Sequence, residues 1–220
     1  NLCGYIFKSD SPSSGMERVK VYTESGMPVK KGVGLFARAL MSHFPLIPVE
    51  EEGRLHDPSL RENFIERIFA LKRWRDLAAA GAGLGGLVDF HSKNKLLFLS
   101  HSPQLYREMG RLVAGAKSFG PAEAFSRYER LMMQALLLKA TAKKHTNVLH
   151  HMLGYFKNDL TADEKQEMLQ IIDRFKNGIL PLIVPVTLIQ HFVRKYSQPY
   201  LAQQTYLAPH PVELQLRNHV

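Results

Sequence analysis

Residues Ala78 to Gly86 read A-A-A-G-A-G-L-G-G, and this segment divides the chain into two parts of different character. Four glycines in nine residues remove the side chains that could anchor a core, which is typical of a flexible connection. The glycines do not follow a strand in the order G-x-G-x-x-G, so they do not indicate a dinucleotide site. We therefore expect a linker at residues 78–86, between a domain of residues 1–77 and a second domain of residues 87–220.

Before the linker, short β-rich runs alternate with helical patterns, which indicates an α/β unit. The β-rich runs are Gly4–Lys8, Arg18–Tyr22 and Phe44–Val49. A helix is expected over Lys31–His43. Asp57-Pro58, an N-cap residue followed by proline, opens another helix that reaches about Arg75. The acidic run Glu50–Glu52 is expected to be solvated surface.

After the linker the sequence predicts helices only, so the overall class is α+β, with an α/β portion followed by an all-α domain. The expected helices are Leu87–Leu99, Pro103 to about Gly115 with Ser102 as its cap, a single long helix from Pro121 to about Tyr155, a helix from the capping box Thr161–Glu164 to Gly178, and Leu182–Tyr196, which Pro185 begins or kinks. The tail from Tyr206 is expected to run extended across the surface.

The charge distribution favours an anionic partner for the second domain. The chain carries a net charge of +9, with 12 Lys+Arg against 10 Asp+Glu in residues 1–86 and 17 against 10 in residues 87–220. Such an excess suits nucleic acid or a membrane surface. The longest apolar stretch, Ile179–Ile189, holds two prolines and is too short to span a bilayer, so we expect no membrane segment.

One cysteine, Cys3, leaves no intramolecular disulfide and suits a reducing compartment. The chain begins with Asn1 and its first methionine is Met16, so we expect a fragment of a longer protein or a processed start.

The candidate binding residues lie in the tract Lys139–Tyr155, K-A-T-A-K-K-H-T-N-V-L-H-H-M-L-G-Y. At 100° per residue, one side of the helix is polar and holds Lys139, Lys143, Thr146, Asn147, His150 and Lys157. From Arg127 to Lys157 there are six Lys+Arg and only Glu129 to balance them. Lysines could neutralise phosphates while the amide and imidazole donate hydrogen bonds. The alternative is an ordinary solvated helix face.

The predicted contacts with a polyanion are therefore on this tract, and a second choice lies at the end of a later helix. They are Lys139, Lys143, Lys144, Asn147 and His150, followed by Arg194 and Lys195.

Histidines near this tract have simpler explanations than metal binding. His145 projects from the apolar face, as a hydrogen-bonded core histidine would. Together with His150 and His151 it has no H-E-x-x-H spacing and no nearby carboxylate, and we expect no metal site. His91 and His101 flank the basic segment H-S-K-N-K and either add to the same surface or are plain surface residues.

The loop Ser11–Gly15, S-P-S-S-G, could place hydroxyls and amides at a ligand, or it could be an ordinary turn. No spacing of Ser, His and Asp identifies a catalytic triad.

Several long motifs resemble one known arrangement. G-Y-I-F-K-S-D-S-P-S-S-G-M-E-R-V-K-V-Y, with G-V-G-L-F-A and F-P-L-I-P-V-E-E-E-G-R-L-H-D-P, is similar to the C-terminal half of the thiouracil desulfidase domain. L-V-D-F-H-S-K-N-K-L-L-F-L-S-H-S-P, H-T-N-V-L-H-H-M-L-G-Y-F-K and Y-L-A-P-H-P-V-E-L resemble the helical domain that follows it. Proteins with this fusion are bacterial desulfidases that remove sulfur from 4-thiouridine in transfer RNA.

The resemblance implies a four-iron, four-sulfur cluster, held in full-length members by three cysteines with one iron open to the substrate's sulfur. Two of those cysteines belong to a segment that this chain lacks. The third belongs to an S-P-S-C-G motif that reads S-P-S-S-G here, so Ser14 stands at the ligand position, and Ser11 matches the serine beside the substrate. A serine hydroxyl replaces a thiolate poorly on iron, so we expect no cluster on this chain.

These observations lead to one functional expectation and one alternative. By the resemblance, the first domain is the chemical part of a cytoplasmic transfer RNA desulfidase, here without its cluster ligands, and the helical domain holds the transfer RNA. The alternative is a non-catalytic interaction module whose helical domain binds DNA or an anionic protein.

Overall fold

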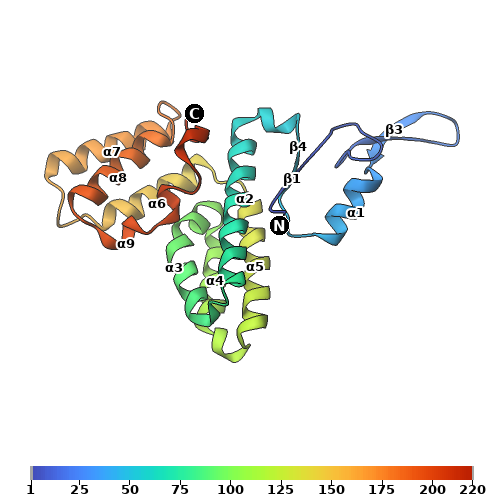
Figure 1. Cartoon of the computed structure of the whole chain (residues 1–220). Coiled ribbons are helices and arrows are strands. Elements are labelled where there is room, and N and C mark those ends of the chain that lie inside the picture. Colours follow the sequence, from blue (N-terminus) through green and yellow to red (C-terminus); the bar gives the residue numbers. More distant parts are fainter. Residues whose placement is uncertain (1, 220) are drawn as a thin grey trace. The chain divides into compact units, whose positions relative to one another are not determined.

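The computed structural model describes residues 2–219, and the chain divides into two compact units, Asn1–Lys72 and Arg73–Val220 (Figure 1). This division lies inside helix α2 (Pro58–Ala79), earlier than the glycine-rich segment. That segment differs from the expected linker because most of it is helical: α3 (Gly83–His101) follows α2 after a short turn. Alanine is a strong helix former, and the close approach of the two helices explains one glycine, since a Cβ on Gly86 would lie 3.2 Å from Leu77.

The first unit contains two small sheets and one full helix. Strand β1 (Tyr5–Phe7) pairs in parallel with β4 (Val49–Glu51), and the connection between them includes the helix α1 (Leu35–His43). Strands β2 (Val19–Tyr22) and β3 (Pro28–Gly32) form an antiparallel hairpin. A small core forms around Phe7, Ala37 and Leu40. The expected helix over Lys31–His43 therefore begins later than predicted, because its first residues belong to β3.

Helix α2 begins as the sequence predicts. The Asp57 side chain accepts a hydrogen bond from the backbone N–H of Leu60 at 3.0 Å, and Pro58 takes the first helical position. A short 3₁₀ turn, η1 (Arg54–His56), precedes it.

The prediction that the acidic run Glu50–Glu52 is solvated surface was wrong for Glu50 and Glu51. Glu50 is buried and its carboxylate lies 2.6 Å from Arg54 Nε. Glu51 is buried and accepts the Met16 backbone N–H at 2.9 Å. Lys8, 3.0 Å away, is the main cause that lowers the pKa of Glu52 to about 2. Glu50 and Glu51 fix the chain around β4, because buried acids are stable only with such partners, whereas Glu52 is only partly buried.

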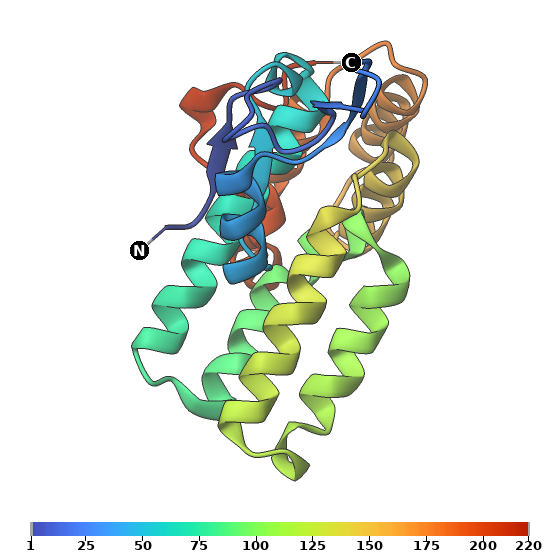
Figure 2. The ribbon, with the colours of Figure 1, turned by 90° about the vertical axis from the view of Figure 1, so that its right-hand side faces the viewer.

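The second unit is helical throughout. Its elements after α3 are α4 (Pro103–Ala114), η2 (Ala116–Ser118), α5 (Pro121–Leu137), α6 (Ala142–Gly154), α7 (Ala162–Lys176), α8 (Ile183–Lys195), α9 (Pro199–Ala202), η3 (Thr205–Leu207) and η4 (Val212–Leu214). Figures 1 and 2 both show α3, α4 and α5 side by side with nearly aligned axes, while α6, α7 and α8 form a second group. An aromatic cluster holds the first group together: Trp74 stacks on Tyr128 at 5.0 Å and meets Phe90 edge to face.

Local capping signals are confirmed in this unit. The Ser102 side chain accepts the Leu105 N–H at the start of α4. Thr161 and Glu164 form the expected capping box at the start of α7. Pro185 lies in the first turn of α8, where its missing N–H costs no helical hydrogen bond, so it begins this helix and does not kink it.

The single long helix expected from Pro121 to Tyr155 is two helices. The chain leaves the helical conformation at Leu138, and the Thr141 side chain caps α6 by accepting the Lys144 N–H. The Leu138 carbonyl, which a continuous helix would use, is instead hydrogen-bonded to His101 Nδ1 at 2.7 Å. A contact between distant elements thus replaces the helical bond.

The tail from Tyr206 is not extended across the surface as expected. The Tyr206 ring is fully buried, and Arg217, also buried, donates to the Tyr206 carbonyl at 2.7 Å. The Ile183 N–H in turn donates to the Arg217 carbonyl. The tail therefore belongs to the core of the helical unit. Among the described residues, no helix combines the length and the apolar character needed to cross a bilayer.

Candidate nucleic-acid interface

The loop Ser11–Gly15 is docked onto the start of α1. The Ser13 carbonyl accepts the N–H of Phe36 at 2.8 Å and of Ala37 at 3.2 Å. These are N–H groups that the first turn of a helix leaves without a helical partner. Gly34 permits this approach, because a Cβ there would overlap the Ser13 carbonyl and lie 2.8 Å from the Ser14 nitrogen. The motifs S-P-S-S-G and G-V-G-L-F-A thus form one structural unit.

The two predicted site serines lie next to each other in this loop. Ser11 Oγ accepts the Ser14 N–H at 3.2 Å and lies 3.3 Å from Ser13 Oγ. Ser11 and Ser14 are both half-buried. Their hydroxyls could bind a polar ligand.

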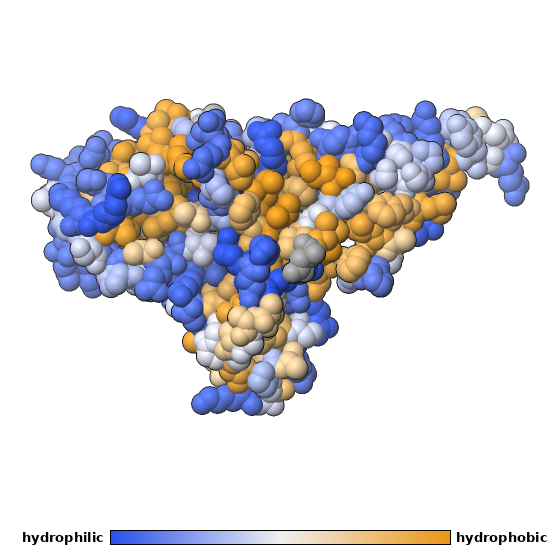
Figure 3. All heavy atoms as spheres, viewed as in Figure 1, coloured by the Kyte–Doolittle hydropathy of each residue, from blue (hydrophilic) through white to orange (hydrophobic). Residues whose placement is uncertain are grey.

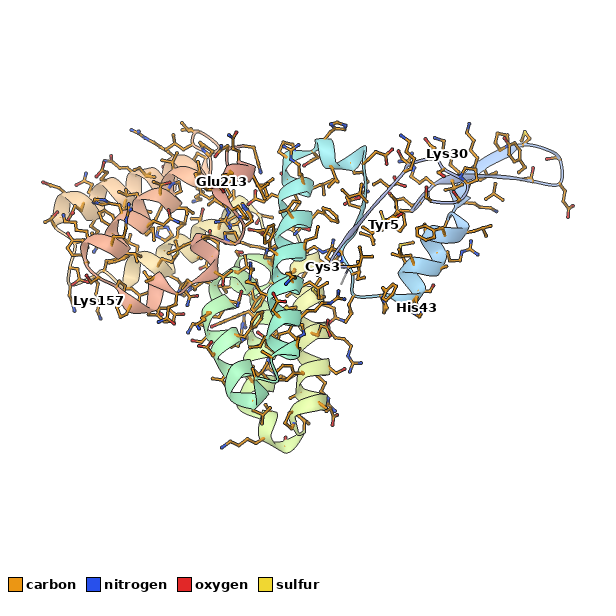
Figure 4. All side chains as sticks on the ribbon, in the orientation of Figure 1. Cys3, Tyr5, Lys30, His43, Lys157 and Glu213 are labelled. Carbon is orange, nitrogen blue, oxygen red and sulfur yellow. The ribbon has the colours of Figure 1, made fainter. Side chains whose placement is uncertain are left out.

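An iron–sulfur cluster does not fit the donors of this chain. Such clusters are held by thiolates, and the chain has one cysteine, Cys3, on the segment that leads into β1 (Figure 4). Hydroxyls are hard donors that suit iron–sulfur clusters poorly.

Helix α6 presents three of the predicted contacts on one exposed face. Lys143, Asn147 and His150 are exposed and are spaced three and four residues apart, so they lie on one stripe. Figure 3 shows hydrophilic residues over much of the visible surface of α6–α9. Thr146, which the periodicity placed on the same face, is instead buried. His145 is the hydrogen-bonded core histidine that was expected, with Nδ1 2.9 Å from the Tyr206 hydroxyl.

The two adjacent lysines at the start of α6 differ in their surroundings. Lys144 Nζ donates to the His101 carbonyl at 2.6 Å and to the Lys139 carbonyl at 2.9 Å. Burial lowers the pKa of the Lys144 ammonium. Lys143 is exposed, and its amine makes no hydrogen bond or ion pair with the part of the chain that the structure describes. Lys139 is also exposed but lies in the connection before α6. Lys144 therefore links α6 to α3, whereas the side chains of Lys143 and Lys139 are exposed to solvent.

The second-choice residues lie at the end of α8 and also differ from each other. Arg194 is exposed. Lys195 Nζ lies 2.6 Å from Glu164 Oε1, and that contact is the main cause that lowers the pKa of Glu164 to about 2. Because Glu164 is ionised above that pH, the charge of Lys195 is already balanced. Lys157, on the predicted stripe, lies in the turn after α6 (Figure 4).

Of the two histidines of the segment after the glycines, His101 is not a surface residue and His91 is partly buried. His101 is fully buried against Leu138. His91 Nδ1 is hydrogen-bonded at 3.0 Å to the hydroxyl of buried Tyr128. Burial, followed by the charge of Lys95, lowers the pKa of His91 to about 4, so the ring is neutral near pH 7.

A pocket of about 360 Å³ lies beside the α6 stripe, and sequence reasoning missed it. Asn147 and His151 of α6 form one wall, together with residues from α3, α4 and the turn after α6. The polar and aromatic members that were not predicted are Lys95, Tyr106, Arg107 and Tyr155. In the sequence, Asn147, His151 and Tyr155 belong to the tract Lys139–Tyr155 and Lys95 belongs to the basic segment H-S-K-N-K, but no local pattern joins the two segments.

Comparison with known proteins finds matches for both motif regions. The model described as "Protein of unknown function (DUF1722)" matches residues 95–211, more than half of the chain, and the model described as "2-thiouracil desulfurase" matches residues 1–52. "Uncharacterized protein YbgA" from Escherichia coli (strain K12) is 34% identical over 153 residues, which cover 69% of this chain and 90% of that relative. No solved structure matches the chain. The α6 stripe and the whole pocket lie inside the first matched region.

Proposed function

The chain belongs to the family described as protein of unknown function DUF1722, and from this premise we propose that its helical unit binds transfer RNA. The match to 2-thiouracil desulfurase over residues 1–52 relates the first unit to desulfidases. The proposed whole activity is the removal of sulfur from 4-thiouridine in transfer RNA. In that activity, the proposed role of this chain is to bind the RNA.

The exposed stripe of α6 is the observation that carries the proposal. Lys143, Asn147 and His150 offer one positive charge and several hydrogen-bond donors along one face, and Lys139 adds a charge just before it. Phosphate oxygens are the groups that such a face binds, since cations neutralise them and neutral donors fix the register. Residues 87–220 carry 17 Lys+Arg against 10 Asp+Glu, which attracts a polyanion over longer distances.

The residues of the first unit are proposed to position the RNA's modified base and not to do the sulfur chemistry. Ser11 and Ser14 offer hydroxyls on a loop that the start of α1 holds firmly. A hydroxyl can donate to or accept from a uracil-type edge. The thiolate-held cluster that the chemistry requires does not fit these donors.

Transfer RNA binding by the full chain, measured by fluorescence anisotropy over a range of salt concentrations, tests the proposal. If Lys139, Lys143, Lys95 and Arg107 each neutralise one phosphate, the plot of log K against log salt should have a slope of roughly −3 to −4. A duplex DNA of equal charge should bind more weakly. Equal or tighter binding of the duplex would favour a DNA-binding module, and binding of neither would refute the proposal.

A further inference from the structure

The pocket beside the α6 stripe has the composition of a nucleotide site. Its volume of about 360 Å³ is within the range of roughly 300–1,000 Å³ that small-ligand pockets occupy. Leucines of α3 and Pro103 supply an apolar floor. Two cations, Lys95 and Arg107, and two neutral polar groups, Asn147 and His151, surround that floor. None of the described residues that line the pocket is acidic.

Tyr155 gives the pocket an aromatic wall that is already fixed in place. Its ring stacks on the ring of Tyr200, with centroids 4.8 Å apart and planes at 22°. The ammonium of Lys95 lies 4.8 Å from the centroid of the Tyr200 ring and forms a cation–π contact with it. Tyr155 is nevertheless 42% exposed, so part of its ring surface is open and contributes to the pocket. A third flat ring could therefore extend the stack.

The polar groups around this wall match the remaining parts of a nucleotide. Arg107 is exposed, and its Nε donates to the Pro103 carbonyl at 3.1 Å, which fixes the guanidinium and leaves its terminal nitrogens for a phosphate. Asn147 carries both a donor and an acceptor, as recognition of the edge of a base requires. A purely apolar ligand would leave these groups without partners, which is costly in a partly enclosed site.

Asn147 joins the pocket to the exposed stripe. It is a wall residue of the pocket, and it also lies between Lys143 and His150 on the outer face of α6. A strand whose phosphates follow the stripe would therefore pass the mouth of the pocket. This continuity favours a nucleotide that belongs to a longer RNA over a free one.

We propose that this pocket takes one unstacked base of the bound RNA, which stacks on Tyr155 while its phosphate lies between Lys95 and Arg107. The inference rests on the proposed RNA binding and names a subsite within it. It makes the helical unit selective for RNA that has loops or unpaired ends, because a base inside a regular helix cannot reach a side-chain platform.

The test compares Tyr155→Ala with Tyr155→Phe in the full chain, with transfer RNA and a fully paired RNA duplex as probes. Stacking of a base on an aromatic ring accounts for a loss of roughly 5- to 100-fold in affinity when the ring is removed. Y155A should show this loss for transfer RNA, with an unchanged salt slope because no charge is removed. Y155F should bind within about 3-fold of the wild type, and both variants should bind the duplex as the wild type does.

A Tyr155→Trp variant keeps the test decisive if Y155A fails to fold. Its indole should be quenched when transfer RNA binds, against the background of the buried Trp74. Salt-dependent transfer RNA binding by the wild type with no loss in a folded Y155A, or with no quenching in Y155W, overturns the subsite and leaves the proposed function standing. Absence of any RNA binding by the wild type overturns both.

Discussion

Two neighbouring lysines allow binding and folding to be separated with matched substitutions. Lys143 and Lys144 have the same chemistry and are adjacent in the sequence, but among residues 2–219 only Lys144 is bonded to the protein, through the carbonyls of His101 and Lys139. Replacement of each by glutamine removes one charge and keeps most of the side chain. We expect Lys143→Gln to affect RNA binding and Lys144→Gln to affect stability.

The magnitudes follow from the contacts. Hydrogen bonds that involve a charged group contribute about 1.5–3 kcal/mol when buried, and the partial exposure of Lys144 reduces the sum for its two bonds to about 1–2 kcal/mol. For a protein of this size, that loss lowers Tm by roughly 2–8 °C. Loss of one phosphate contact at Lys143 should flatten the slope of log K against log salt by about 0.7–0.9.

Thermal unfolding followed by circular dichroism and transfer RNA binding at several salt concentrations measure both quantities on both variants. K143Q should keep the wild-type Tm within about 1 °C, since exposed substitutions rarely change stability by more than about 0.5 kcal/mol. The reasoning fails if K143Q leaves the salt slope unchanged. It also fails if K144Q melts with the wild type, since the two carbonyl contacts would then contribute nothing.

Three further outcomes are expected. His91 has a pKa of about 4 in the fold and about 6.5 when unfolded, so its contribution to the free energy of unfolding is complete above pH 6.5 and is lost as pH falls toward 4. In urea titrations between these pH values, His91→Gln should reduce the slope of the unfolding free energy against pH by up to about 1.4 kcal/mol per pH unit. Gly34→Ala should destabilise the first unit by about 1–3 kcal/mol, measured by urea unfolding, because its Cβ would overlap the Ser13 carbonyl. As a control, Gly154→Ala should not destabilise the protein, because a Cβ at this exposed position meets open space. The purified chain should be colourless and contain no stoichiometric iron after anaerobic reconstitution, and a stable thiolate-to-iron absorption band would contradict the donor argument.

The elements that the sequence predicted well are those whose signals are local. Ser102-Pro103 and the Thr161–Glu164 box use side chains that bond to their own helix, so the residues involved are neighbours in the sequence. The break before α6 could not be found in this way. It depends on the bond between His101 and the Leu138 carbonyl and on the bond from Lys144 to the His101 carbonyl, and in each pair the partners are distant in sequence.

In the candidate site too, the features that depend on local sequence were predicted and those that depend on contacts between distant segments were not. Helical periodicity correctly placed Lys143, Asn147 and His150 together, because all three belong to one helix. The same periodicity placed Thr146 on the wrong side, since it contains no information on how far neighbouring helices cover α6. The pocket was missed because its residues come from three separate helices and a turn, from Lys95 to Tyr155. Only packing brings them together.

The distribution of paired and unpaired charge indicates where a polyanion would bind on the helical unit. Lys195, at the end of α8, faces Glu164, which is ionised at any pH above about 2, so an incoming phosphate would compete with an existing ion pair. Lys143 and Arg107 are exposed and have no acidic partner among the described residues. A phosphate gains more from a cation that has no counter-charge, because no protein contact is broken. The balance of charge therefore supports the proposed RNA contacts along α6 and the pocket beside it, and it argues against Lys195 as one of them.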